Sequence, residues 1–180
     1  MNIEDTDWKK IHLVPEKSGY RVAYNMSKYK FTTPGLHIPF GVEIYNKKEI
    51  LNLVIINNTN EKHNFINYLD KIENIYQQFT GKNLLDNNLP IVNLPPDFME
   101  DVKNKEYVKT LKPGPIGPTL RTHLKKNVEI YKIVSGKKIL VEKKDIIKKN
   151  CKCEIEFSNI WIFGDKCGIL WYINKIEVLE

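Results

Sequence analysis

The chain has 180 residues, 42% of them hydrophobic and 28% charged, and a formal net charge of +6, which predicts a single globular domain over residues 1–180. No run of about 18 apolar residues occurs, so no membrane span is predicted, and the acidic N-terminal stretch lacks the apolar segment of a secretory signal. Three cysteines are too few for a disulfide framework, which favours free thiols in a reducing compartment.

The first third of the chain is predicted to consist mainly of β-strands. Residues 1–19 show no pattern and are predicted to be irregular. In residues 20–31 the side chains alternate between two faces, as in a half-buried strand. Residues 40–45 and 50–56 then predict a hairpin, whose second arm is almost continuously apolar and is therefore expected to be central.

Residues 60–80 change to a helical period. Apolar side chains recur there at spacings of 4, 3, 4 and 3 residues, at Phe65, Leu69, Ile72, Tyr76 and Phe79. Asn58, Thr59 and Asn60 offer helix N-caps, and Gly81 offers a stop signal. The apolar stripe is expected to pack against the sheet.

Residues 82–119 are predicted to be a long loop, because six prolines interrupt them. The segment 112–118, Lys-Pro-Gly-Pro-Ile-Gly-Pro, is typical of a stiff polyproline-like connection. Strands of the same character are predicted on both sides, so we do not interpret the loop as a domain linker.

Strands resume in the last third of the chain. The predicted strands are 119–124, a hairpin of 128–134 and 137–142, and a final pair of 151–163 and 168–178, with a short basic turn or single helical turn over 143–150. The chain then has seven or eight strands, one helix and no βαβ alternation. This pattern is typical of a mainly β fold, an antiparallel barrel or sandwich with a helix at one end. Among small barrels the OB-fold fits well, so we predict an antiparallel OB-fold-like barrel with one amphipathic helix and a long Pro-rich loop.

The positive charge is concentrated in one quarter of the chain. Residues 109–153 hold thirteen Lys or Arg against three acidic residues, whereas residues 1–108 hold thirteen against fourteen. Such a focused excess favours a polyanionic partner. The alternative is that many of these lysines only solvate the surface of a chain rich in Lys, Asn and Ile.

The search for catalytic or metal-binding residues is mostly negative. No Gly-rich phosphate loop and no nucleophile-elbow serine occur. Cys151, Cys153 and Cys167 could approach one another across a hairpin, but zinc would need a fourth ligand and C-x-C is not the usual spacing. Three acidic residues of the Pro-rich segment, Asp97, Glu100 and Asp101, could hold a catalytic metal, although no strand motif supports them. We therefore expect no catalysis, no cofactor and no bound metal.

Aromatic residues near the basic region suggest a surface for single-stranded nucleic acid. Binding without sequence preference needs a cationic groove and exposed aromatic faces on which bases stack. Alternation places Trp161 and Phe163 on one face of their strand with Phe157, and Trp171 on one face of the next strand, but either face could be the barrel interior. The candidate nucleic-acid-binding residues are Arg121, Lys125, Lys126, Tyr131, Lys132, Lys137, Lys138, Lys148, Lys149, Trp161 and Trp171.

The C-terminal third resembles a known family. Its pattern is a basic turn, Asp-Ile-Ile-Lys-Lys-Asn (145–150), a strand that ends in Ile-Trp-Ile-Phe (160–163), the turn Gly-Asp-Lys-Cys-Gly (164–168), and the strand Ile-Leu-Trp-Tyr-Ile-Asn-Lys-Ile-Glu-Val (169–178). This pattern is similar to the end of the single-stranded-DNA-binding proteins of nucleocytoplasmic large DNA viruses and, more distantly, of the phage T7-type single-strand-binding protein. The resemblance extends from Thr119 to Val178, and upstream only the order of elements agrees.

The resemblance implies an OB-fold protein of viral DNA replication, recombination or repair that binds single-stranded DNA without catalysis. It also implies replication proteins as further partners, and a location in the viral factory of the infected host's cytoplasm or in the nucleus. Homo-oligomerisation is left open, and no membrane association is expected. The alternative function is a protein-interaction or structural module of a viral replication or transcription complex that does not itself bind DNA.

Overall fold

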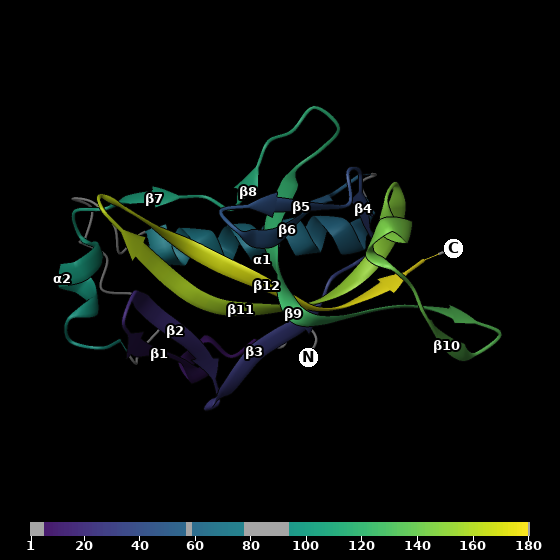
Figure 1. Ribbon diagram of the computed structural model, residues 1–180. Helices are drawn as coiled ribbons and strands as arrows, with labels where there is room; N and C mark the ends of the chain where they lie inside the picture. The colour runs from purple at the N-terminus through teal and green to yellow at the C-terminus, as the bar shows by residue number, and fades with distance from the viewer. Residues whose placement is uncertain (1–5, 57–58, 78–93, 180) are drawn as a thin grey trace.

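A computed structural model describes residues 6–56, 59–77 and 94–179 of the chain (Figure 1). The described strands are β1 (Ile11–Glu16), β2 (Gly19–Tyr24), β3 (Ser27–Thr32), β4 (Leu36–Ile38), β5 (Val42–Tyr45), β6 (Lys48–Val54), β7 (Glu106–Val108), β8 (Leu111–Lys112), β9 (Thr119–Val134), β10 (Lys137–Leu140), β11 (Lys149–Phe163) and β12 (Lys166–Val178). The described helices are α1 (Asn60–Gln77), α2 (Phe98–Val102) and the short 3-10 helices η2 (Trp8–Lys10) and η3 (Lys143–Ile146). Among them, no helix is both long enough and apolar enough to cross a bilayer.

Five strands close into a barrel. Around the ring, β11 pairs with β4, β4 with β6, β6 with β9, β9 with β12, and β12 again with β11. All of these pairs are antiparallel except β9–β12, which is parallel. The fold is therefore mainly β and OB-like, as predicted, but its barrel is mixed rather than purely antiparallel. β1, β2 and β3 extend the sheet on one side of β11.

The amphipathic helix predicted over 60–80 is confirmed over Asn60–Gln77. Four residues of its predicted stripe, Phe65, Leu69, Ile72 and Tyr76, are buried in the main core. The ring of Tyr76 lies edge-on to Phe157 of β11 at 5.4 Å, which places the helix against the inner side of the sheet. Phe79 and the predicted stop at Gly81 lie outside the described residues.

The Pro-rich segment contains more structure than predicted. Residues 82–93 lie outside the described part of the chain, but residues 94–118 form α2, β7 and β8, and β7 pairs in parallel with β12. Glu73 of α1 ties this segment to the helix, because its Oε1 accepts hydrogen bonds from the backbone N–H groups of Thr110 at 2.6 Å and Leu111 at 3.3 Å. Glu73 is fully buried, and these bonds replace the hydration that its Oε1 loses.

Two strand predictions near the N-terminus are wrong. Residues 11–16, predicted to be irregular, form β1, which pairs along its whole length with β2. The single strand predicted over 20–31 is a hairpin of β2 and β3 that turns at Asn25 and Met26, whose φ angles are 49° and 63°. Such a pair of left-handed residues is the geometry of a tight two-residue hairpin turn, but Asn-Met lacks the glycine that usually signals it.

A β-bulge in β11 changes which aromatic side chains face outward. Phe157 is opposite Trp171 and Asn159 is opposite Leu170, so Ser158 is an extra residue in the ladder. A one-residue insertion moves all following side chains to the other face. Phe157 is consequently in the core, whereas Trp161 is on the outer face, and the prediction that these two residues share a face is wrong.

Candidate nucleic-acid interface

The long strand β9 carries the largest share of the candidate residues. Leu120, Thr122 and Leu124 are buried, so Arg121 and Lys125 must lie on the outer face of the barrel. The pairing of β9 with β12 is irregular between Leu124 and Glu129. Beyond it, Ile130 is again buried and Tyr131 faces outward, so the outer face continues along the whole strand.

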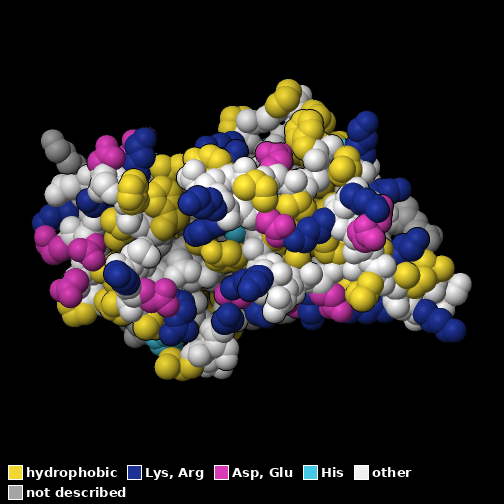
Figure 2. All heavy atoms as spheres, in the orientation of Figure 1, with side chains coloured by type: hydrophobic (Ala, Val, Ile, Leu, Met, Phe, Trp, Pro, Cys, Tyr) yellow, Lys and Arg dark blue, Asp and Glu magenta, His cyan; other side chains and the backbone are white. Residues whose placement is uncertain are grey.

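Three cation–aromatic pairs follow this outer face. The Arg121 guanidinium lies 5.5 Å from the ring centroid of Tyr45, the Lys125 ammonium 4.4 Å from that of Tyr172, and the Lys138 ammonium 4.2 Å from that of Tyr131. We refer to these six side chains as the β9 track. Each pair is within the range of a cation–π contact, so the track combines positive charge with aromatic faces. Figure 2 shows Lys and Arg side chains spread over one face of the molecule, with acidic and apolar side chains between them.

The hairpin of β9 and β10 projects from the body of the molecule (Figure 1). We call residues 128–140 the hairpin arm. Its register places Tyr131 and Lys138 on one face and Lys132 and Lys137 on the other. Lys132 and Lys149 both line an open groove of about 460 Å³ at the base of the arm.

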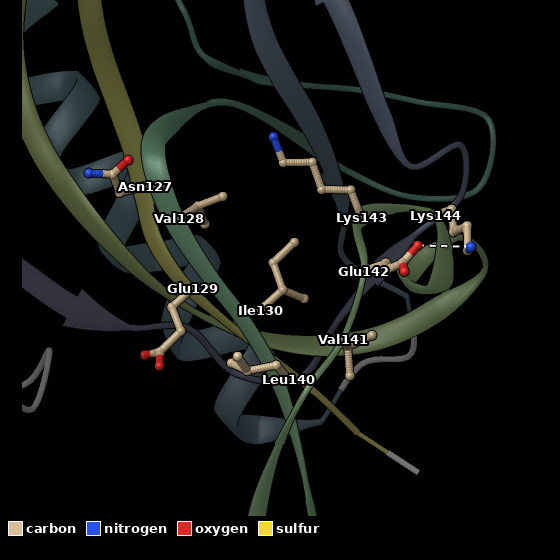
Figure 3. Close-up of a pocket in the computed structure, with 9 residues that line it drawn as sticks. All are labelled: Asn127, Val128, Glu129, Ile130, Leu140, Val141, Glu142, Lys143 and Lys144. Atoms are coloured by element: carbon tan, nitrogen blue, oxygen red, sulfur yellow. Dashed lines mark ion pairs between the residues drawn. The ribbon is translucent and has the colours of Figure 1, made fainter.

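A second groove, of about 720 Å³, lies between the start of the hairpin arm and η3 (Figure 3). Its apolar lining comes from Val128, Ile130, Leu140 and Val141. The lysines on its η3 side are already paired, because Lys143 contacts Glu49 at 2.6 Å and Lys144 contacts Glu142 at 2.8 Å. This groove therefore offers apolar surface more than free charge.

The predicted site residues separate into several groups. Arg121, Lys125, Tyr131 and Lys138 come together in the β9 track, and Lys132, Lys137 and Lys149 on or beside the reverse face of the hairpin arm. Lys126 is exposed on β9, directly after Lys125. Lys148 is exposed just before β11, and its φ is 59°. Trp161 is partly buried on the outer face of β11, and its ring packs on the backbone of Gly168.

The prediction that Trp171 stacks on bases is wrong. Its side chain is 1% exposed and packs between Phe157, with ring centroids 4.8 Å apart, and Phe31, at 5.9 Å. Its indole N–H donates to the hydroxyl of Thr110 at 3.1 Å. Trp171 is therefore a core residue, packed against two rings that themselves contact α1.

Most of the eight predicted cations are free to meet an external anion. Within the described part of the chain, no carboxylate lies within 4.0 Å of six of them: Arg121, Lys126, Lys132, Lys137, Lys148 and Lys149. Lys125 is paired with Glu156 at 3.3 Å and Lys138 with Glu129 at 2.6 Å. The other six cations lie along β9, in the hairpin arm and around the start of β11.

Two aromatic members of the track, Tyr45 and Tyr172, are not among the predicted site residues. A signal for Tyr172 was present, because it alternates with Trp171 and so had to face outward once Trp171 was inside. Tyr45 stands beside the β5–β6 turn, and its 53% exposure could not be read from the pattern. His123 lies between Arg121 and Lys125 on the same face, and burial, with Lys48 and Arg121 nearby, lowers its pKa, so it adds no charge at neutral pH.

The cysteines do not form a shared site. Cys151 and Cys153 lie near one end of the β11–β12 pair and Cys167 lies near the other, and all three are buried free thiols. Burial raises the pKa of Cys151 to about 12 and that of Cys167 to about 11. Among the described residues, no group of three His, Cys, Asp or Glu side chains is placed to hold a metal ion.

We expect the three thiols of the native protein to be unreactive toward an aromatic disulfide reagent at about pH 8. The attacking species is the thiolate, and at this pH, below the raised pKa values, the thiols stay protonated. The absorbance of the aromatic thiolate that the reagent releases measures the reaction. Unfolding in urea should make all three thiols reactive. A Ser135→Cys variant, in the exposed hairpin turn, is the positive control. Rapid reaction of a native thiol would contradict the burial described above.

The acidic residues of α2 have structural partners. The hydroxyl of Tyr20 donates to Asp101 at 2.5 Å, and Lys103 pairs with Glu100. Burial raises the pKa of Tyr20, with a further contribution from the Asp101 carboxylate, so the phenol remains a donor. Asp101 thus anchors α2 to β2, which accounts for its position without a metal.

No protein-family profile and no curated protein matches the sequence. Three solved structures are similar to the chain at low identity. The single-stranded DNA-binding protein from bacteriophage Enc34 is 12% identical over 94% of this chain and 89% of that chain, with a TM-score of 0.46. The same phage protein in complex with single-stranded DNA is 10% identical over 96% of each chain, with a TM-score of 0.46. Its C-terminal truncation is 9% identical over 95% of each chain, with a TM-score of 0.49.

Proposed function

We propose that the protein binds single-stranded DNA without sequence preference and without catalysis, along the β9 track and the hairpin arm. The observation that carries the proposal is the series of three cation–aromatic pairs, each with one member on β9 and the other on a nearby strand of the OB-like fold. Positive groups beside aromatic faces meet both needs of single-strand binding, since cations neutralise phosphates and every base has a face that can stack.

The position of the track in the barrel supports the same reading. In chain order β6 and β9 are the second and third strands of the ring, and OB-folds bind oligonucleotides on the face of these two strands. Each stacked base would contribute about 1–3 kcal/mol, and phosphate contacts would supply the rest of the affinity. Neither contribution depends on the base sequence.

The setting that we propose is the replication, recombination or repair of viral DNA, in the viral factory of the host cytoplasm or in the nucleus. This part of the proposal rests on the sequence resemblance of residues 119–178 to the single-stranded-DNA-binding proteins of large DNA viruses. Replication proteins would be further partners, and homo-oligomerisation along the DNA is compatible with this role.

Salt dependence tests the proposal. Anisotropy of a labelled oligo-dT of about 30 nucleotides, longer than the roughly 4–16 nucleotides that one OB-fold covers, should report binding. We expect the logarithm of the association constant to fall linearly with the logarithm of the salt concentration, with a slope of about −0.7 for each phosphate contacted. Affinity that does not change with salt would refute the proposal. Absence of binding at low salt, together with a stable protein partner, would favour the interaction-module alternative.

A further inference from the structure

An acidic residue lies beside the Lys125–Tyr172 pair of the proposed binding face. Glu156 of β11 is directly opposite Tyr172 of β12 on one side and Lys30 of β3 on the other. It is 3% exposed, although the residue faces the outer side of the barrel. A buried carboxylate among lysines is unexpected on a surface that binds polyanions, because it repels phosphate.

Two lysines from different strands converge on one oxygen of Glu156. Lys125 Nζ lies 3.3 Å and Lys28 Nζ 3.6 Å from Oε1, while Oε2 has no hydrogen-bond partner among the described residues. The side chains of Lys125 and Lys28 are 30% and 56% exposed, against 4% for Glu156. A phosphate can therefore approach both ammonium groups from solvent, while the carboxylate holds them from beneath.

The same contact covers an aromatic ring. Lys125 reaches Glu156 across Tyr172, and its ammonium lies 4.4 Å from the centroid of that ring. A base cannot stack on this face of Tyr172 while Lys125 lies over it. The Glu156–Lys125 ion pair therefore closes a stacking position of the β9 track in the free protein.

We propose that Glu156 acts as an internal competitor of DNA phosphate: it holds Lys125 over Tyr172 until a phosphate draws the lysine away and a base takes its place. This inference rests on the proposed function and adds to it a residue that sets the affinity. Glu156 contacts no DNA in this scheme and is a positioning residue, acting through Lys125 and Lys28.

Glu156→Gln tests the inference, because it removes the charge and keeps the shape of the side chain. We expect the dissociation constant for oligo-dT to decrease about three- to tenfold at low salt, the size expected for release of a partly buried ion pair. We also expect the salt slope to become steeper by about 0.7 for each lysine that gains a phosphate.

Glu154→Gln is the matched control. Glu154 lies two residues earlier on the same strand and face, and also pairs with two lysines, Lys30 at 3.5 Å and Lys175 at 3.6 Å. Its side chain is 28% exposed, and neither lysine lies over an aromatic ring of the described residues. The same change of net charge should therefore tighten binding less than about twofold. When Tyr172 is also replaced by leucine, Glu156→Gln should increase the affinity for oligo-dT no more than Glu154→Gln does.

An NMR measurement provides a readout that a purely structural role would not affect. In the free protein the terminal methylene protons of Lys125 should resonate upfield, because they lie over the Tyr172 ring, and saturating oligo-dT should abolish that shift. If the protein binds oligo-dT but the two Gln variants respond equally, or the Lys125 shift persists, the competitor role is overturned and the proposed function stands. If neither the native protein nor Glu156→Gln binds, both are overturned.

Discussion

Replacing Arg121, Lys126 and Lys132 together by methionine is expected to weaken oligo-dT binding about 100-fold at low salt. These exposed cations are distributed along β9, and none pairs with a described carboxylate, so each is available to a phosphate. A nonspecific phosphate contact contributes about 1 kcal/mol, and three of them correspond to roughly two orders of magnitude. The salt slope should decrease in size by about 2. Fluorescence anisotropy across a salt titration measures both effects.

The control for this variant removes three lysines elsewhere: Lys17 in the β1–β2 turn, Lys71 on α1 and Lys103 after α2. The net charge changes equally, but none of these positions lies on β9 or in the hairpin arm. The control should lose less than about threefold in affinity, and both triple variants should keep their free energy of unfolding within about 0.5 kcal/mol, as surface substitutions usually do. Equal losses of affinity in the two variants would show that net charge, and not the β9 surface, governs binding.

Replacing Trp171 by alanine is expected to lower the free energy of unfolding by about 3–5 kcal/mol, the usual cost of removing a large aromatic side chain from a core. The ring is 1% exposed and packs against Phe31 and Phe157, so its loss leaves a cavity in the core. The Thr110 hydroxyl would also lose its donor. Urea unfolding followed by circular dichroism measures the change.

Trp161→Ala is the companion variant, because its indole lies on the outer face and is only partly buried. Its loss of stability should be near 1 kcal/mol, typical of a single substitution outside the core. If oligo-dT binds near the outer face, it should quench tryptophan fluorescence, and Trp161→Phe should reduce this quenching more than Trp171→Phe does. Equal destabilisation by the two alanine variants would contradict the different burial of the two rings.

Local patterns in the sequence predicted the elements that local physics determines. The stripe from Phe65 to Tyr76 needs only the helical period, and the hairpin across Ser135 and Gly136 needs only its turn and the flanking alternation. Both are confirmed. The mainly β, OB-like fold followed from the number of such strands and the absence of βαβ units.

The remaining features depend on contacts that no local pattern contains. The parallel β9–β12 pair joins segments about 50 residues apart, and the bulge at Ser158 becomes visible only when β11 is paired with β12. The same limit affects the site. The basic segment was readable from composition, but the pairing of Lys125 with Glu156 across Tyr172 requires three strands in register. Whether the β9 residues contact DNA stays a prediction.

The pairing of β12 also has a consequence for how the molecule folds. The ring is open until this strand docks, because it joins β9 to β11, and pairing between such distant segments is slow compared with the formation of a helix or hairpin. Until then the facing edges of β9 and β11 would be unpaired, and unpaired strand edges promote aggregation. Tyr172 is part of β12, so a chain whose barrel has not closed also lacks the Tyr172 ring on the proposed binding face. Protection from aggregation and assembly of the proposed binding face are therefore the same folding event.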